Sequence, residues 1–286
     1  MSTFKLGLIG YPLGHSLSPK IHTAALKACG LDGEYSLFPI HPDDKQGLKD
    51  LLQRVRSGDL HGLNVTIPHK QNVIEFMDEL TPTAKAIGAV NTIYLRDKKL
   101  IGDNTDAPGF LSDLKRFLTM ECDGLLSCAQ EQAHAFQKTA LILGAGGSAR
   151  AVVYALVNDG WNVTVAARRI ERAQQLLDSF PDYKLSITTF SNLSLSIFHL
   201  LVNATPIGMS LNIDQSPLPE NVSLSPHTMI YDLVYNPRET KLVRDARAQG
   251  LQATTGLGML VEQAALAFEI WTGHKPSREI LFESVS

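Results

Sequence analysis

The segment Asn64–Lys70, NVTIPHK, ends a run of strand-forming residues with a proline and leaves a lysine behind it. A lone lysine most often carries an exposed, solvated side chain. In open α/β sheets, however, ligands bind outside the carboxyl ends of the strands, which is where Lys70 stands. Asn64 and Thr66 are two residues apart, so an amide and a hydroxyl can project from the same face of the strand. The motif therefore predicts a polar binding site next to the lysine.

Two further polar clusters end elements of the same region: GHSLS after the first expected strand and GDNTD after an expected hairpin. Each of their side chains alone could be a cap or a turn residue, and Ser18, which precedes Pro19, has the sequence of a helix N-cap. Together they would line a small pocket with hydroxyl, amide and carboxylate groups, which suits a polyhydroxylated ligand. The predicted pocket consists of Ser16, Ser18, Asn64, Thr66, Asn91 and Asp106.

The segment Gly144–Ala149, GAGGSA, follows an apolar run and opens a helical pattern. In that context the spacing of its small residues is typical of a dinucleotide-binding turn. Gly144 would permit the tight turn, Gly146 would let the backbone approach a pyrophosphate, and Ala149 would allow close packing of the helix. The first amide groups of the helix would face the anion. The cofactor contacts expected here are Gly144, Ala145, Gly146, Gly147, Ser148, Ala149 and Arg150.

Three arginines follow the next expected strand, in the segment AARRIER. Chains that bind NAD place Asp or Glu at this strand end to hold the ribose 2′-hydroxyl, and no carboxylate stands at the strand end here. Arg168, Arg169 and Arg172 instead offer guanidinium groups, which match a 2′-phosphate. A solvated basic face is the alternative, but the helix dipole disfavours arginine at a helix start, so a bound anion explains the cluster better. We therefore expect NADP rather than NAD.

The N-terminal part of the chain alternates short apolar runs with helical patterns, which predicts parallel strands joined by right-handed crossovers. Two apolar runs in residues 89–106 flank the polar turn RDKK and indicate a hairpin added to the sheet. We expect an N-terminal α/β substrate domain with a mixed, mainly parallel sheet. The predicted strands are 5–10, 34–40 and 60–68, and the predicted helices are 19–30, 43–58 and 71–80.

A second alternation begins at Thr139, where residues 139–169 read as a compact βαβ unit. Further strands expected at 199–205 and 229–234 would complete a Rossmann-type, doubly wound domain. Residues 119–136 show weak periodicity and are interpreted as a surface insertion or linker. The last helix, 258–273, is apolar around much of its circumference and should be well buried, although its periodicity does not tell where it packs.

Composition narrows the class of protein. The chain has 286 residues, 44% hydrophobic and 19% charged, which is the balance of a globular protein with two domains. A formal net charge of -3 argues against nucleic acid or anionic lipid as partners. No apolar run could span a membrane and the N-terminus does not resemble a signal peptide, so we expect a cytoplasmic protein.

Cys29, Cys122 and Cys128 are too few for a four-ligand zinc site and unlike a disulfide framework, so we expect reduced thiols and no metal.

Eight motifs resemble shikimate dehydrogenase in their order and approximate spacing, over nearly the whole chain. They are SLSP, NVTIPHK, AVNT, GDNTD, GAGGSAR, NATPIGM, DLVYNP and GLGMLVEQAALAFEIW. This resemblance implies an NADP-dependent enzyme of aromatic amino acid biosynthesis that interconverts 3-dehydroshikimate and shikimate.

By this resemblance, Lys70 and Asp106 form the catalytic pair. The substrate contacts that it implies are Ser16, Ser18, Thr66, Asn91, Tyr235 and Gln263. The cofactor contacts that it adds are Leu233, through its backbone, and Gly256 near the nicotinamide, and Asn203 and Thr205 near the adenosine end.

The expected domains are residues 1–106 for substrate binding and catalysis, 107–138 for a connecting helix and insertion, 139–254 for NADP binding and 255–286 for the C-terminal helices. Gln263 is assigned to the substrate although its helix follows the Rossmann region. The C-terminal helix should therefore return to pack on the N-terminal domain. The expected partner is the small-molecule substrate, and the expected assembly is a monomer or a homodimer.

The reaction explains the lysine. Hydride transfer from NADPH to a carbonyl develops negative charge on the oxygen, which a nearby ammonium group can stabilise and protonate. Asp106 would hydrogen-bond both the ammonium group and a substrate hydroxyl. It would favour the charged lysine while burial would oppose it, and the sequence leaves that balance open. His69 should point to the opposite side of an extended chain, so we do not expect it to act as the base.

Two departures from the family pattern and two alternative functions remain. The family commonly writes its phosphate motif Asn-Arg-Thr-x-x-Arg, and here Ala167 and Arg169 replace the Asn and the Thr, while the stretch between Asp106 and Gly144 looks longer than usual. A quinate/shikimate dehydrogenase paralogue that uses NAD would be favoured by an acidic residue at the strand end, where this chain is basic. A non-catalytic NADP-binding sensor would have no need of Lys70 and Asp106.

Overall fold

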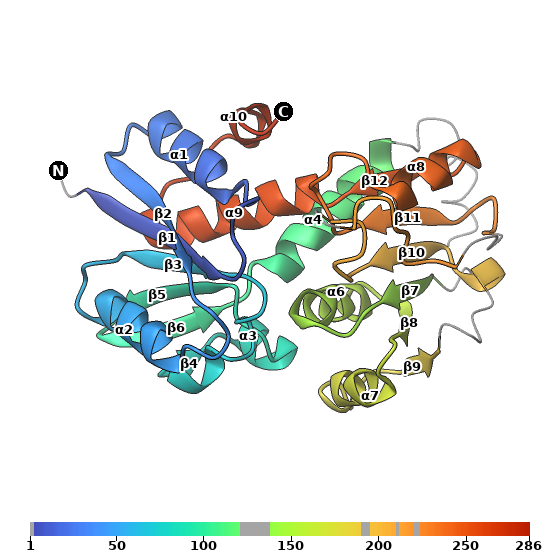
Figure 1. Cartoon of the computed structure of the whole chain (residues 1–286), viewed down its shortest axis with the longest axis horizontal. Coiled ribbons are helices and arrows are strands. Elements are labelled where there is room, and N and C mark those ends of the chain that lie inside the picture. The colour runs from blue at the N-terminus through green and yellow to red at the C-terminus, as the bar shows by residue number, and fades with distance from the viewer. Residues whose placement is uncertain (1–2, 121–137, 190–194, 210–211, 220–223) are drawn as a thin grey trace. The chain divides into compact units, whose positions relative to one another are not determined.

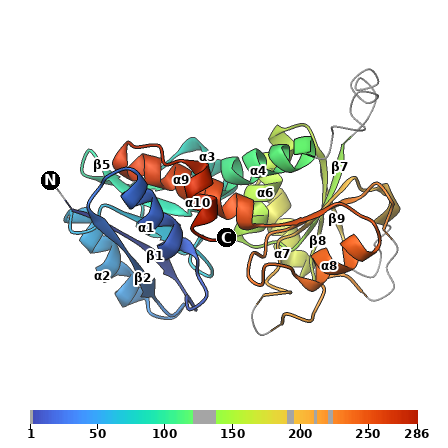
Figure 2. The ribbon, with the colours of Figure 1, turned by 90° about the horizontal axis from the view of Figure 1, so that it is seen from above.

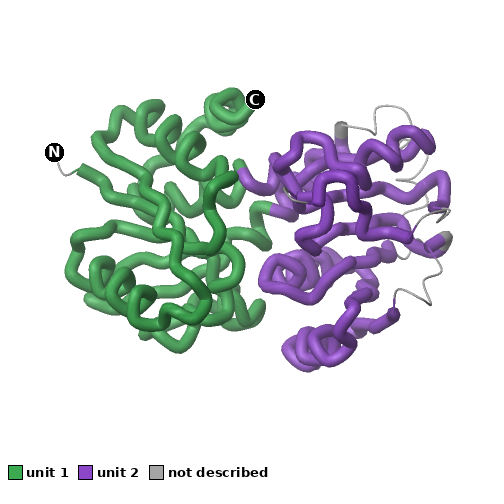
Figure 3. The backbone as a smooth tube through the Cα atoms, in the orientation of Figure 1, with its two compact units in different colours: residues 1–109, 261–286 green, residues 110–260 purple. Residues whose placement is uncertain are grey.

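The computed structural model describes residues 3–120, 138–189, 195–209, 212–219 and 224–286. The chain forms two compact units, which Figure 3 colours separately: unit 1 contains residues 1–109 and 261–286, and unit 2 contains residues 110–260. Each unit contains one six-stranded sheet. Within the described residues, no helix is both long enough and apolar enough to cross a membrane.

The sheet of unit 1 is mixed, as predicted. Its order is β2-β1-β3-β5-β6-β4, in which β3 pairs antiparallel with β5 and β5 pairs antiparallel with β6 (Figure 1). The predicted hairpin is this β5–β6 pair. Asp97 and Lys98 turn it with positive φ angles. The strands are β1 (Phe4–Gly10), β2 (Gly33–Pro39), β3 (Gly62–Val65), β4 (Glu79–Leu80), β5 (Thr92–Arg96) and β6 (Lys99–Asp103).

Helices α1 (Ser18–Ala28) and α2 (Lys45–Arg56) confirm two of the three predicted N-terminal helices. The apolar stripe of α2 packs on alternate residues of the sheet, among them Leu63 and Val65 of β3. Because side chains alternate along a strand, Asn64 then faces the opposite side of the sheet. A short helix that was not predicted, α3 (Pro82–Ile87), precedes the hairpin.

Two predictions for this region were wrong. Residues 71–80 are not a helix: a 3-10 turn, η1 (Ile74–Phe76), is followed by strand β4. The backbone N–H groups of Asp78 and Thr81 donate to the carbonyls of Leu100 and Gly102, so edge pairing with the hairpin outweighs the helical periodicity. Ser18 is also not an N-cap, because α1 begins at Ser18 itself and the Ser16 hydroxyl oxygen accepts the Ser18 N–H.

The C-terminal helices pack on unit 1, as predicted. Helix α9 (Leu257–Thr272) contributes its residues from Val261 onward to this unit, and its Trp271 indole N–H donates to the Ile93 carbonyl at 3.1 Å. A side chain at Gly62 of β3 would lie 2.2 Å from that indole nitrogen, so glycine is needed there. Helix α10 (Arg278–Glu283) lies beside α1 (Figure 2).

The sheet of unit 2 is parallel throughout, in the order β12-β11-β10-β7-β8-β9. This is the doubly wound order with a switch point between β7 and β10, as predicted. Its strands are β7 (Thr139–Leu143), β8 (Asn162–Ala166), β9 (Leu185–Thr188), β10 (Leu200–Asn203), β11 (Met229–Asp232) and β12 (Ala253–Thr255). Its helices are α4 (Asp106–Met120), whose first turn belongs to unit 1, α6 (Gly147–Asn158), α7 (Ile170–Asp178) and α8 (Lys241–Ala248), with a 3-10 turn η3 (Leu195–Ile197).

The helix start expected at the arginines is that of α7, whereas β9, β12 and α8 were not predicted. The predicted insertion at 119–136 falls almost entirely outside the described residues, as do Cys122 and Cys128. Cys29 is a free thiol, and burial raises its pKa.

A buried histidine lies in the core between α1 and α9. His22 is fully buried, its ring stacks on Tyr35 with centroids 4.3 Å apart, and Trp271 lies 5.4 Å away. Neither ring nitrogen has a hydrogen-bond partner among the described residues. Burial lowers the pKa of His22 to about 3, against a weaker opposing influence of Asn64. The ring is therefore neutral in the folded protein at neutral pH.

This histidine should make unit 1 sensitive to acid. Its pKa is lower in the folded chain than in the unfolded chain, so its contribution to stability is complete above about pH 6.5 and is lost as the pH falls toward 3. Between pH 7 and pH 5 the expected loss from this one group is about 2 kcal/mol. His22→Phe, which keeps an aromatic ring against Tyr35, should remove that part of the loss.

The measurement is urea unfolding of unit 1 at pH 7 and pH 5. His227→Ala, which changes an exposed histidine, serves as the control and should lose stability as the wild type does. An equal loss in wild type and His22→Phe would contradict the assignment.

Candidate active site

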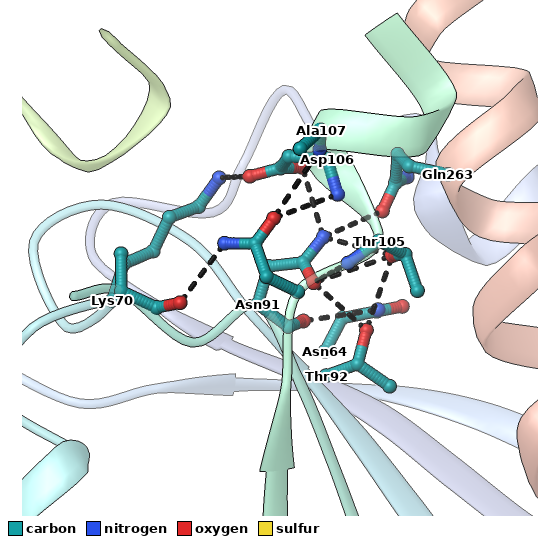
Figure 4. Close-up of polar contacts among 10 residues, drawn as sticks. Asn64, Lys70, Asn91, Thr92, Thr105, Asp106, Ala107 and Gln263 are labelled. Atoms are coloured by element: carbon teal, nitrogen blue, oxygen red, sulfur yellow. Dashed lines mark hydrogen bonds and ion pairs between the residues drawn. The ribbon is translucent and has the colours of Figure 1, made fainter. Parts of the chain in front are cut away.

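The predicted lysine and aspartate meet in unit 1. Lys70 Nζ donates to Asp106 Oδ2 at 2.5 Å, and the two side chains are 10% and 5% exposed (Figure 4). Lys70 follows β3 beyond Pro68, and its carbonyl accepts the Val90 N–H at 2.7 Å, which fixes its backbone. Removing one partner of such a buried pair would leave the other charge without compensation. An ion pair this buried is not the solvated lysine that composition alone would suggest.

The aspartate is held by the start of a helix. Asp106 is the first residue of α4, where the helix dipole favours a carboxylate. The side-chain oxygen of Asn104 accepts the N–H groups of Asp106 at 3.1 Å and Ala107 at 3.3 Å, and its amide donates to the Ala89 carbonyl at 2.9 Å. Asn104 was not predicted. Its signal in the sequence is an Asn two residues before a helix start.

Asn91 connects this pair to the rest of the site. Its side-chain nitrogen lies 2.8 Å from Asp106 Oδ1, 3.0 Å from Thr105 Oγ1 and 3.3 Å from Gln263 Oε1. Its side-chain oxygen accepts the Thr105 N–H at 2.7 Å and the Thr92 hydroxyl at 2.9 Å. The amide therefore orients the aspartate from the side opposite the lysine, as Figure 4 shows. Thr92 and Thr105 are also residues that the sequence reasoning did not single out.

Gln263 reaches this cluster from the C-terminal helix. It is buried, and α9 can bring it close because α4 carries glycine at position 109. A side chain there would lie 2.8 Å from the Gln263 backbone nitrogen. The contact of Gln263 with Asn91 joins residues 172 positions apart in the sequence. The structure thus unites Lys70, Asp106, Asn91 and Gln263, as the sequence predicted.

Other predicted pocket residues lie near the same strand ends. Asn64 is buried on β3, with its side-chain oxygen accepting the Tyr35 hydroxyl at 2.8 Å and its nitrogen donating to the Asn91 carbonyl at 3.2 Å. Thr66 follows β3 and is half-buried, while of the two serines at the start of α1 Ser16 is half-buried and Ser18 buried. Tyr235 follows β11 in unit 2, and its place in the pocket remains a prediction.

His69 does not join the site, in agreement with the prediction. It is 1% exposed, and its Nε2 lies 2.7 Å from the Ile40 carbonyl oxygen. It lines a small cavity of about 140 Å³ with residues such as Asn72 and Glu75.

In unit 2, the predicted glycine-rich turn joins β7 to α6. Gly144 has φ +112°, a conformation that L side chains rarely adopt, and its Cβ position faces the Ala204 carbonyl at 3.0 Å. Gly146 is exposed and forms the N-cap of α6, so it offers no side chain to the first amides. Ala149 is completely buried. The remaining members, Ala145, Gly147 and Ser148, are half-buried.

The arginines of this unit divide into two kinds. Arg168, Arg169 and Arg172 are exposed around the start of α7, next to the end of β8. Arg150, by contrast, is 8% exposed. Its guanidinium group donates to the Ser179 hydroxyl at 2.9 Å and to the Gln175 carbonyl at 3.4 Å. It binds the C-terminal end of α7, so its predicted contact with a cofactor gains no support from this geometry.

The remaining predicted cofactor residues lie at the carboxyl ends of β10, β11 and β12. Asn203 accepts the Thr205 N–H at 3.0 Å and hydroxyl at 2.7 Å. The Leu233 N–H donates to the Asn203 carbonyl at 2.9 Å. Gly256 approaches this backbone so closely that a Cβ atom would lie 2.2 Å from the Leu233 carbonyl oxygen. The four residues thus lie together at the carboxyl ends of these neighbouring strands.

Comparison with models of protein families matches three segments of this chain. Residues 8–93 match the family model of the shikimate dehydrogenase substrate binding domain, 127–241 that of shikimate / quinate 5-dehydrogenase and 256–281 that of the shikimate 5'-dehydrogenase C-terminal domain. The shikimate dehydrogenase (NADP(+)) of Shouchella clausii is 37% identical over 281 residues, which are 98% of this chain and 96% of the relative.

Solved structures are similar to this chain over nearly its whole length. Shikimate 5-dehydrogenase from Thermus thermophilus, in complex with NADP(H) and shikimate, is 36% identical with a TM-score of 0.83, and the match covers 99% of this chain and 98% of that one. Quinate dehydrogenase from Corynebacterium glutamicum, in complex with NAD, is 30% identical with a TM-score of 0.85, over 99% and 98% of the two chains. By these matches over nearly its whole length, the chain belongs to the shikimate dehydrogenase family.

Proposed function

We propose that this chain catalyses the reaction of its family, the reversible NADPH-dependent reduction of 3-dehydroshikimate to shikimate. It is then an oxidoreductase of the shikimate pathway, which leads to chorismate and the aromatic amino acids. The observation that carries the proposal is the buried Lys70–Asp106 pair, oriented by Asn91, in the unit that matches the family's substrate binding domain.

The substrate would be held by unit 1. Hydroxyl and amide groups of Ser16, Ser18, Thr66, Asn91 and Gln263 are suited to the hydroxyls and the carboxylate of shikimate, and Tyr235 of unit 2 is assigned there by resemblance. Asn64, which bonds to Tyr35 and to the Asn91 backbone, belongs to the same proposed set. The expected division of labour gives residues 1–106 and 255–286 to the substrate and 139–254 to the cofactor.

The residues of unit 2 fit NADP. The turn at Gly146 and the first turn of α6, where the N-cap residue offers no side chain, suit a pyrophosphate, and the exposed Arg168, Arg169 and Arg172 suit a 2′-phosphate. Leu233 and Gly256 would present backbone to the nicotinamide, and Asn203 and Thr205 would contact the adenosine end. When bound, NADPH supplies the hydride.

Lys70 would protonate the carbonyl oxygen of the substrate and stabilise the negative charge that develops there. Asp106 would hold the ammonium group in place, and its second oxygen would accept a hydrogen bond from a substrate hydroxyl. Asn91 holds that oxygen at 2.8 Å, which fixes the direction of the carboxylate. In the reverse direction the same lysine takes up the proton.

Specificity for NAD and quinate is the nearest alternative, since the quinate dehydrogenase with bound NAD is also similar to this chain. Against it, β8 ends at Ala166 and is followed by exposed arginines, where a carboxylate would be expected for NAD. A non-catalytic sensor is the second alternative, and the buried Lys70–Asp106 pair argues against it. The proposal includes a cytoplasmic location and a monomer or a homodimer.

The role of Lys70 can be tested by truncation. Lys70→Ala should lower kcat by roughly 10²–10⁴-fold, because it removes the positioned proton donor. The dissociation constant for shikimate should change much less, since Ser16, Ser18, Asn91 and Gln263 remain in place. Steady-state kinetics and direct shikimate titration at matched pH give both quantities.

Lys99→Ala is the matched control, because it removes a lysine of the same unit whose partner, Glu79, is on the surface. It should leave both constants unchanged. Near-normal turnover in Lys70→Ala, or an affinity loss in proportion to the rate loss, would make Lys70 a binding residue.

The cofactor assignment has its own test. Arg168→Ala should raise KM for NADP far more than KM for NAD, because only NADP carries the 2′-phosphate. Both values come from initial rates with shikimate and each cofactor. Arg244→Ala, which removes an exposed arginine of α8, should change neither value. Equal losses with the two cofactors in Arg168→Ala would refute the assignment.

A further inference from the structure

A buried carboxylate lies in unit 2, at the strand ends that carry the predicted cofactor residues. Asp232 is the last residue of β11 and is completely buried. It accepts three hydrogen bonds: from the Asn203 side-chain amide at 2.8 Å, from the Val234 N–H at 3.0 Å and from the Thr240 hydroxyl at 2.7 Å. The donors come from the end of β10 and the segment after β11, and all three converge on this one group.

Such a carboxylate is costly in a fold. Burial raises the pKa of Asp232 to about 6, although the three donors act in the opposite direction. An uncharged residue would avoid the desolvation penalty of a buried ion. Stability alone therefore gives no reason for an aspartate here, whereas the arrangement of its donors does.

The first donor controls the segment after β10. With its nitrogen bound to Asp232, the Asn203 side chain turns its oxygen toward Thr205 and accepts both the N–H and the hydroxyl of that residue. The nitrogen also lies 3.2 Å from the Ile207 carbonyl. The conformation of residues 203–207 thus depends on the amide orientation that Asp232 imposes.

The other donors control the segment after β11. The Val234 N–H bond folds the backbone around Leu233, and the Val234 carbonyl accepts the Gly256 N–H at 3.2 Å. Thr240 returns the same segment to Asp232 and caps α8 by accepting the Val243 N–H. One carboxylate thereby links the ends of β10, β11 and, through Val234, β12.

We propose that Asp232 is a positioning residue for NADP(H): it holds the segments 203–207 and 233–240 in the conformation that receives the cofactor. The inference rests on the proposed function for the identity of the cofactor. Because Asp232 is completely buried, it acts through Asn203 and the Leu233–Val234 backbone and makes no contact with the cofactor itself.

Asp232→Asn tests this role. An amide of the same shape keeps one acceptor but turns an NH₂ group toward groups that are themselves donors. The dissociation constant for NADPH, measured by its fluorescence on titration, should rise about tenfold or more. The dissociation constant for shikimate should rise less than that for NADPH, because Tyr235 is the one proposed substrate ligand that lies in a segment held by Asp232.

Two further variants separate positioning from stability. Thr240→Val removes only one donor, and it should raise the NADPH constant by a smaller factor; it decides the question if Asp232→Asn does not fold. Thr228→Val is the matched control, since Thr228 is buried at the opposite end of the same strand, where its hydroxyl donates to the Phe198 carbonyl at 2.8 Å. It should lower Tm without changing NADPH affinity.

Unchanged NADPH affinity in folded Asp232→Asn, or in Thr240→Val if the first variant fails to fold, would overturn the inference. So would an affinity loss in Thr228→Val as large as that in Asp232→Asn. A wild-type protein that binds NADPH but does not oxidise shikimate would refute the proposed reaction and leave the role of Asp232 standing.

Discussion

The ion pair between Lys70 and Asp106 is the interaction on which the rest of unit 1 depends. Its two side chains are almost completely removed from water, so the fold must supply a precise partner for each charge and polar groups that hold the carboxylate in place. The hairpin supplies Asn91, the loop after it supplies Asn104, and α9 supplies Gln263. Glycines at 62 and 109 permit the approach of α9 that brings Gln263 in. The close packing of α9 on unit 1 therefore also brings a polar side chain to the ion pair.

In unit 2, the proposed cofactor site consists largely of backbone groups. Its glycine turn and strand ends present amide and carbonyl groups to a ligand, and such groups need an internal support that fixes their direction. Asp232 has the geometry of such a support, with one carboxylate holding three donors from the end of β10 and the segment after β11. In both units, an asparagine donates to a buried carboxylate and also hydrogen-bonds a further residue of the site, Asn91 with Gln263 and Asn203 with Thr205.

Much of this could be predicted from the sequence, because the strands and the long helices have clear periodicity and glycine marks the cofactor turn. Polar clusters at the ends of expected elements placed Asn91 and Asp106 near Lys70, whereas Gln263 joined them only through the family pattern, since nothing local relates residues so distant. The helix predicted for residues 71–80 was wrong because edge pairing of β4 with β6 outweighs their helical spacing. Arg150 stands within a cofactor motif, yet it binds the end of α7. Tyr35, Asn104 and Asp232 act through other residues, so a sequence shows only ordinary polar positions.

The return of α9 to unit 1 also has a consequence for synthesis of the protein. Residues 110–260 form a contiguous unit that can fold as soon as the ribosome releases it. Unit 1 cannot, because Trp271 bonds to Ile93 and Gln263 to Asn91 across 178 and 172 positions. Contacts that distant form late. The pocket around the lysine is thus completed only when nearly the whole chain exists, and a truncated nascent chain would carry a folded nucleotide module without an assembled catalytic centre.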